Sequence, residues 1–249
     1  LVDAKRGHTA QEVVDAVARL KRRGMTVGVQ LLPGLKGETW ETILETAIAV
    51  VKLEPDFVRI YPVLVIENTE LADQYRSGEY EPLSTEQAIK YCAFLKEWFE
   101  QHNIEVIRTG LQSTEELDSG NSLVAGPYEP AMGELVVNEQ YKQRIERCID
   151  EHLSSENLLG KQNDYKLSHF DCYYIHKVKC RSYSDSGDIL MKHRIVISYP
   201  RSSTSKVRGL KNRNILYFQE MYPQFSIDWC EDNTRNTVRC CIDGLQYML

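Results

Sequence analysis

The sequence predicts a mixed α/β protein that begins with a parallel sheet covered by helices. Residues 27–32 and 56–65 are almost wholly apolar, which is typical of strands buried on both faces of such a sheet. Between them, apolar residues recur at helical spacing from Trp40 to Val51. The resulting order, helix–strand–helix–strand, is that of a doubly wound sheet or a (β/α) barrel.

The first elements have clear boundaries. Thr9 and Glu12 form a capping box that should start a helix, and Gly24 should end it. The strand at residues 25–32 then leads into a turn built on Pro33, Gly34 and Gly37. The next helix should open near residues 38–39 and end before Pro55.

The middle of the chain predicts more helix. We expect a short helix over residues 69–77 and a long one from Ser84, capped with Gln87, to His102. A strand should follow at residues 104–111. Residues 115–130 are rich in Gly, Ser, Asn and Pro and predict a loop. Residues 139–153 predict a charged helix that bridges two modules.

The last ninety residues predict a small α+β domain. Strands are expected at residues 193–199, 225–229 and 237–242, and helices at residues 202–207 and 214–222. The order is therefore β-α-α-β-β.

Composition excludes several classes of protein. No apolar run approaches the ~20 residues needed to cross a bilayer, and no secretory signal leads the chain. The seven cysteines have no CxxC spacing, so they predict neither a disulfide framework nor a zinc site, but reduced thiols in a cytoplasmic protein. Because the chain starts with Leu1 amid apparent structure, we expect a preceding portion of the same protein.

The net charge of −6 conceals an asymmetry. Residues 161–249 carry 14 basic and 9 acidic side chains, whereas residues 1–160 carry 16 and 27. Such a difference favours different partners for the two parts, although solvated surfaces that happen to differ explain it equally well.

One ordered set of motifs resembles the radical S-adenosylmethionine (SAM) enzymes, in particular the branch with the catalytic subunit of Elongator and proteins labelled oxygen-independent coproporphyrinogen III oxidase-like. The set covers about residues 1–137. It consists of RGHT at 6–9, VQLLPGLKGET at 29–39, RIYP at 59–62, LADQYRSGEYEPL at 71–83 and IRTGLQS at 107–113.

The resemblance implies a site at the ends of the first strands. Gln30, Leu32, Gly34 and Glu38 would lie near the adenosyl end of SAM, and Tyr61 with the backbone around Ile60 would face the adenine. The alternative is that the glycines only make a strand-to-helix turn. Arg6 and His8 would meet the ligand or simply face solvent at the helix start.

The same resemblance implies a [4Fe–4S] cluster that this sequence does not supply. The family holds its cluster with three cysteines at CxxxCxxC spacing, in a loop that would precede Leu1. No cysteines here have that spacing. We therefore assign no catalytic residue and expect the chain to be inactive alone, while a complete parent would generate a 5′-deoxyadenosyl radical.

The C-terminal part is similar to a KH domain, a module that binds four nucleotides over a GxxG loop. Here the loop begins at Gly209 and reads GLKN, so its second glycine is missing. Arg208, Lys211 and Arg213 belong to a segment with five cations and no acid, which suits an RNA backbone. A degenerate fold used for packing is the alternative.

The histidines of the C-terminal part show no ligand spacing. His169, His176 and His193 lie among tyrosines and cysteines without an HxxxH pattern, so no metal is assigned.

Together these features predict a partial parallel (β/α) barrel at residues 1–65, an α/β extension at 66–137, a linker helix at 138–160 and a KH-like α+β domain at 161–249. The expected function is part of a radical SAM enzyme acting on RNA, with tRNA as first candidate. The alternatives are a non-catalytic RNA-binding or scaffolding piece and a coproporphyrinogen III oxidase-like activity.

Overall fold

The computed structural model describes residues 5–118, 120, 122–157 and 193–249. The chain forms two compact units, Leu1–Val136 and Val137–Leu249, and each is described by itself. Residues 161–192 of the expected KH-like domain, which include His169 and His176, lie outside the described residues.

A three-stranded sheet organises the first unit. Its strands are β1 (Gly28–Leu31), β2 (Phe57–Ile60) and β4 (Glu105–Thr109), in the order β1-β2-β4. Both pairings are parallel. The expected parallel pairing of the first two strands is therefore confirmed, and the strand assigned to the extension lies in the same sheet.

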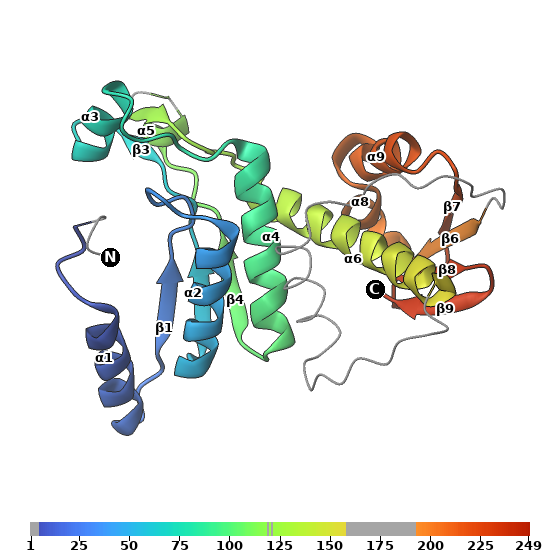
Figure 1. Cartoon of the computed structure of the whole chain (residues 1–249), viewed down its shortest axis with the longest axis horizontal. Coiled ribbons are helices and arrows are strands. Elements are labelled where there is room, and N and C mark those ends of the chain that lie inside the picture. Colours follow the sequence, from blue (N-terminus) through green and yellow to red (C-terminus); the bar gives the residue numbers. More distant parts are fainter. Residues whose placement is uncertain (1–4, 119, 121, 158–192) are drawn as a thin grey trace. The chain divides into compact units, whose positions relative to one another are not determined.

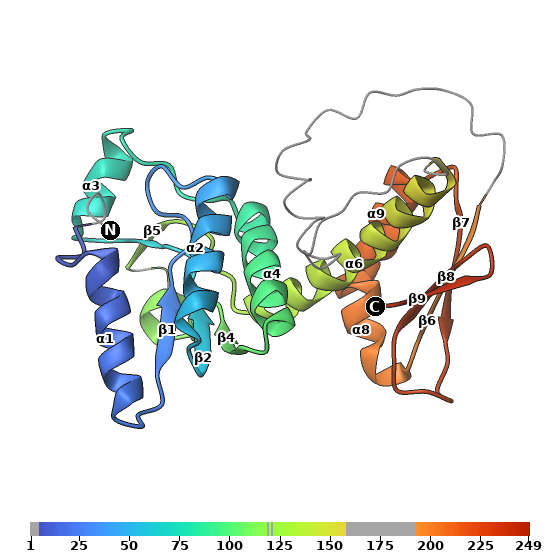
Figure 2. The ribbon, with the colours of Figure 1, turned by 60° about the horizontal axis from the view of Figure 1, so that its bottom comes forward.

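Three helices in the first unit begin at capping boxes. They are α1 (Ala10–Arg22) after Thr9, α2 (Trp40–Leu53) after Thr39, and α4 (Thr85–Gln101) after Ser84. Each capping side chain accepts a backbone N–H and so satisfies a group that the helix cannot. Figures 1 and 2 show α2 and α4 side by side against the sheet.

The core of the first unit lies between the sheet and these two helices. Ile43 and Ala47 of α2, and Val58 and Ile60 of β2, are buried. Trp40 stacks edge-on against Tyr91 of α4 with ring centroids 4.3 Å apart. Edge-to-face contacts of this kind favour a fixed helix–helix register.

The expectation that the strands are buried on both faces is wrong for the described residues. Leu31 and Ile60 are buried, but their neighbours Gln30 and Arg59 are exposed. Side chains alternate along a strand, and the helices cover only one face. The opposite face is open.

The second expected strand is divided. β2 ends at Ile60, and residues 65–66 form β3 (Val65–Ile66), which pairs antiparallel with β5 (Leu123–Ala125) in a separate two-stranded sheet. Pro62 lies at the break, and proline has no N–H for the parallel ladder. The region expected to be a loop thus contains β5 and the short helix α5 (Glu115–Asp118).

The helices α3 (Glu70–Arg76) and α1 both form, but the apolar stripe of α1 is mostly exposed. The short helix α3 is capped by Thr69, as its sequence predicts. The stripe of α1 is mostly open: Val17 is buried, but Val14 and Leu20 are 41% and 38% exposed. Few apolar groups of the described residues lie against this face of α1.

The second unit is built on a four-stranded sheet. Its strands are β6 (Arg194–Tyr199), β7 (Ser226–Glu231), β8 (Arg239–Ile242) and β9 (Leu245–Met248), in the order β7-β6-β8-β9. β6 pairs parallel with β7, and the other pairings are antiparallel. The predicted order β-α-α-β-β is present, and β9 adds a strand that the pattern did not reveal.

The helices of the second unit pack on one face of this sheet (Figure 2). They are α6 (Met132–Asn157), α8 (Thr204–Arg208) and α9 (Arg213–Met221). Short 3₁₀ turns, η1 (Arg201–Ser203) and η2 (Leu210–Asn212), precede α8 and α9. Ile145 and Ile149 of α6 lie in the same core as Ile197 and Phe218.

The predicted bridging helix lies within α6, which begins at Met132 and crosses the boundary between the two units at residues 136–137. Its apolar stripe also belongs to the core of the second unit. The stripe is narrow because charged side chains surround it, but Ile145 and, one turn later, Cys148 and Ile149 suffice to pack on a sheet.

None of the described helices has the length and apolar character that crossing a membrane requires.

Candidate functional site

The open face of the first sheet carries polar side chains in register. Gln30 of β1 pairs with Arg59 of β2, and Arg59 pairs with Arg108 of β4. All three are exposed. A bulge at Val58/Arg59 shifts the register so that the two arginines become neighbours across the strands. The sequence indicated Gln30 as a site residue but not these two arginines. Side chains alternate between the two faces of a strand, but this alternation places a residue on the open face only once the face covered by helices is known.

The turn from β1 to α2 is closed by its own chain. The Gly34 N–H donates to a Glu38 carboxylate oxygen 2.5 Å away, and the Tyr80 hydroxyl donates to the Gly34 carbonyl at 2.7 Å. Burial raises the pKa of Glu38, and the Gly34 N–H partly offsets this effect. Burial and the nearby Glu38 raise the pKa of Tyr80 to about 12.

Gly34 has a structural role at this turn. Its φ is +103°, and an added Cβ would lie 3.1 Å from the Leu83 side chain. Gly37 also has positive φ, but nothing lies within 4 Å of its Cβ position. The close approach that requires Gly34 is thus made by Leu83, the last residue of the motif at 71–83.

The ends of β1 and β2 are held together by backbone bonds. Tyr61 N–H donates to the Leu31 carbonyl, and Gly110 N–H donates to the Ile60 carbonyl, each at 2.9 Å. The Ile60 side chain is fully buried on the helix side. The Leu32 and Tyr61 side chains are half-buried and remain partly accessible.

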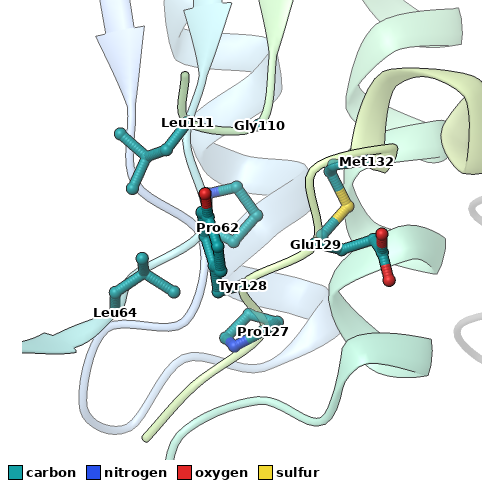
Figure 3. A pocket seen from close by; sticks show the side chains of 8 residues that line it. All are labelled: Pro62, Leu64, Gly110, Leu111, Pro127, Tyr128, Glu129 and Met132. Atoms are coloured by element: carbon teal, nitrogen blue, oxygen red, sulfur yellow. The ribbon is translucent and has the colours of Figure 1, made fainter. Parts of the chain in front are cut away.

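A small pocket lies just beyond the carboxyl ends of β2 and β4. Figure 3 shows its walls, which include Pro62 and Leu64 after β2, Leu111 after β4, and Tyr128 and Met132 from later in the chain. Gly110 is needed here because a Cβ would lie 2.6 Å from Met132. None of the residues predicted to bind SAM lines this pocket, although one of them, Tyr61, directly precedes Pro62.

Ligand sites in parallel α/β sheets lie at the carboxyl ends of the strands. Gln30, Leu32, Glu38 and Tyr61 all fall at or beside those ends of β1 and β2. The structure therefore brings these four residues to one region, while the backbone groups of Gly34 and Ile60 cited above already have partners within the chain.

Known proteins match part of this chain. Residues 55–143 match the Radical_SAM C-terminal domain family. A tRNA uridine(34) acetyltransferase of Methanocaldococcus jannaschii is 32% identical over 153 residues, covering 58% of this chain and 26% of that protein. Human Elongator complex protein 3 is 29% identical over 94 residues, covering 36% of this chain and 17% of that protein. The chain is similar to the C-terminal portion of Elongator-like radical SAM proteins.

A solved structure is also similar. The archaeal Methanocaldococcus infernus Elp3 with an N-terminal deletion is 29% identical, with a TM-score of 0.47, and covers 56% of this chain and 32% of that one. The chain spans about a quarter (26%) of the length of the M. jannaschii acetyltransferase.

The cysteines of the Elongator-like chain offer no cluster motif. Cys92 and Cys148 are buried in different units, and burial raises the pKa of the Cys92 thiol. Cys230 lies on β7, and Cys240 and Cys241 lie on β8, with β6 between these two strands of the second sheet. None of the seven cysteines in the sequence has CxxxCxxC spacing.

The second predicted site, on α8, η2 and α9, is cationic. Lys211 and Arg213 are exposed, as are Arg201 and Lys206, while Arg208 is half-buried. Burial raises the pKa of Tyr199, and Arg208, which hydrogen-bonds the Tyr199 hydroxyl, partly offsets this rise. No acidic group among the described residues forms an ion pair with any of these five cations.

The loop between α8 and α9 has an unusual backbone. Lys211 and Asn212 have φ of 54° and 61°, so two consecutive residues without glycine are left-handed. Asparagine tolerates this conformation, but lysine adopts it at a cost of about 1–2 kcal/mol. An added Cβ on Gly209 would lie 3.0 Å from the Asn214 nitrogen, so this glycine serves the packing of the loop.

Proposed function

We propose that the chain is part of a radical SAM enzyme that acts on RNA, with tRNA as the first candidate substrate. The match of residues 55–143 to the Radical_SAM C-terminal domain carries this proposal. Relatives named for tRNA uridine(34) acetylation favour RNA over a porphyrinogen. A non-catalytic RNA-binding role remains the competing proposal.

In this proposal the first sheet is an arc of a (β/α) barrel. Its strands are parallel, with helices over one face and polar side chains on the other. A barrel has this arrangement, with helices outside and side chains from alternate positions inside. Gln30, Arg59 and Arg108 would then face the interior.

The residues present fit one end of a SAM site in part. Gln30 supplies an exposed amide, Leu32 and Tyr61 supply accessible apolar surface, and Glu38 is fixed beside them by Gly34. The Gly34 and Ile60 backbone groups are already bonded within the chain, so they shape the site rather than contact the ligand. When bound to a [4Fe–4S] cluster, SAM supplies hydrogen-abstracting radical chemistry.

The sequence directly before Leu1 tests the enzyme proposal. A CxxxCxxC segment should occur within the preceding ~150 residues, about the length of one domain. If it does, the cluster-loaded parent protein, reduced with dithionite, should cleave SAM to methionine and 5′-deoxyadenosine, and Gln30→Ala should weaken SAM binding. Absence of the motif would leave only the binding role.

The cationic segment of the second unit would hold the RNA backbone. Lysine and arginine side chains that neutralise phosphates release counterions from the RNA, so affinity should fall linearly with log[salt]. The backbone at Lys211 and Asn212 is left-handed, and strained loops of this kind are frequent at binding sites. A KH-like use of the Gly209 loop follows from this proposal.

Charge reversal tests this part directly. Lys211→Glu with Arg213→Glu should weaken binding of the full chain to single-stranded RNA by well over the ~1 kcal/mol of an ordinary surface charge change. Arg23→Glu with Lys52→Glu, on exposed positions of the first unit, makes the same change in net charge and is the control. Equal binding by wild type and the Lys211/Arg213 variant would show that the loop serves packing alone.

A further inference from the structure

Two imidazoles and a carboxylate converge in the second unit. They are His152 on α6, His193 just before β6, and Asp243 in the turn between β8 and β9. Each offers one ligand atom, and these atoms all lie within 4.8 Å of one another. Both histidines are buried, whereas Asp243 is exposed.

The distances suit a metal ion after small adjustments. His152 Nε2 lies 3.5 Å from Asp243 Oδ2, and His193 Nδ1 lies 2.5 Å from the same oxygen. Ligands about 2.0–2.1 Å from a tetrahedral zinc ion lie roughly 3.3 Å apart. The first pair is already at this separation, and the second needs to open by about 1 Å once the shared proton leaves.

The ligand atoms are held by neighbouring groups. The Arg194 N–H donates to Asp243 Oδ1 at 2.9 Å, which leaves Oδ2 for the cluster. The Tyr247 hydroxyl lies 3.2 Å from His152 Nδ1, which directs Nε2 toward Asp243. The His193 ring packs against Phe225 with centroids 5.5 Å apart. Hydrogen bonds of this kind orient ligands in established metal sites.

Asp243 itself occupies a constrained turn. Its φ is 47° and that of Gly244 is 90°, as the two-residue connection between paired Ile242 and Leu245 requires. The Asp243 N–H donates to the Arg194 carbonyl at 3.0 Å. Asp243 is therefore bonded to Arg194 of β6 through both its backbone and its side chain. The carboxylate is therefore preorganised beside His193.

We propose that His152, His193 and Asp243 bind a zinc ion. Two imidazole nitrogens and one carboxylate oxygen are ligands that Zn²⁺ prefers, and three protein ligands leave a position for water or another group. The ion would connect α6, the start of β6 and the β8–β9 turn, three elements far apart in the sequence. The site is independent of the SAM and RNA proposals.

The test uses the full chain, freed of metal with a chelator, and Zn²⁺ or Co²⁺ alone as the probe. We expect one equivalent to bind by calorimetry and to raise the thermal midpoint, because an ion that binds only the folded state stabilises it. Co²⁺ should give the visible spectrum of a nitrogen and oxygen site without the charge-transfer absorption of cysteine ligands.

Asp243→Asn is the sharpest variant. Its side-chain oxygen can keep the Arg194 N–H bond, and asparagine tolerates positive φ, but it removes the anionic ligand. Zinc affinity should fall at least tenfold. Asp232→Asn changes another turn aspartate of the same unit, which caps Thr234, and should leave affinity within about twofold.

His152→Gln serves as a second variant, and circular dichroism checks that each variant is folded. If wild type binds no stoichiometric zinc, or if Asp243→Asn binds as tightly as wild type, the cluster is a hydrogen-bonded His–Asp–His contact and the proposal is wrong.

Discussion

At the residue scale, Glu38 shows how a turn near the proposed SAM site constrains a carboxylate. Its side chain reaches back to the Gly34 N–H and is largely removed from water, and burial raises its pKa. Glu12 has the opposite behaviour, since N–H and O–H donors of Thr9 lower the pKa of an exposed carboxylate. The two residues therefore predict opposite pH effects.

Because the native state of Glu38 holds its proton to higher pH than the unfolded chain, stability should fall as pH rises from about 4.5 through the native pKa. Glu38→Gln should remove this part of the loss, so the variant gains on wild type between pH 4 and 8 in urea unfolding. Glu12→Gln should instead cost most near neutral pH and little in acid. A parallel pH profile for wild type and Glu38→Gln would contradict the assigned burial.

At the scale of elements, the β1–α2 turn separates two glycines that look alike in sequence. Gly34 has positive φ and abuts Leu83, whereas Gly37 has positive φ and open space around it. Gly34→Ala should combine a backbone cost with overpacking, about 3 kcal/mol, and Gly37→Ala should cost about 1 kcal/mol.

Chemical denaturation of the two alanine variants measures this difference. If Gly34→Ala is no more destabilising than Gly37→Ala, Leu83 does not limit the turn. Leu83→Ala together with Gly34→Ala should recover part of the packing cost, since it removes the side chain that the new methyl group meets.

The element scale also explains how α6 can cross the boundary between the two units and contribute to the core of the second. Its charged residues dominate the sequence, yet Ile145, Cys148 and Ile149 fall on one face and reach the core of the second unit. An apolar stripe of a few residues on one face is enough when a sheet supplies the rest of the core.

At the scale of the whole molecule, two cores stabilise two units. Ile197 is fully buried in the core of the second unit, and Val58 is fully buried in the first. Ile197→Ala should cost about 2–5 kcal/mol and lower hydrogen-exchange protection in β6, β7 and β8. Val58→Ala should affect β1, β2 and β4.

Hydrogen exchange followed by mass spectrometry resolves the two sets of strands. We expect the largest loss of protection for each variant within its own unit. Equal loss across both units after Ile197→Ala would show that the chain unfolds as a single cooperative body.

The sequence by itself determined the features that depend on neighbours along the chain. Thr9, Thr39 and Ser84 mark helix starts because a capping side chain bonds to an N–H three residues away. The parallel α/β class and the cationic segment around Lys211 were likewise visible, since apolar runs and clusters of charge are local patterns. The SAM-site residues came from a resemblance, and the structure brings Gln30, Leu32, Glu38 and Tyr61 to the strand ends without testing their role.

Only the tertiary structure decided what depends on distant contacts. It showed which sheet face the helices leave open, where Pro62 sends the chain into another sheet, and that Leu83 fills the space beside Gly34. It also joined His152 to Asp243 across 91 positions of sequence. No periodicity records such proximity, because the pairing of strands and the packing of a helix on a sheet bring together side chains that no local pattern connects.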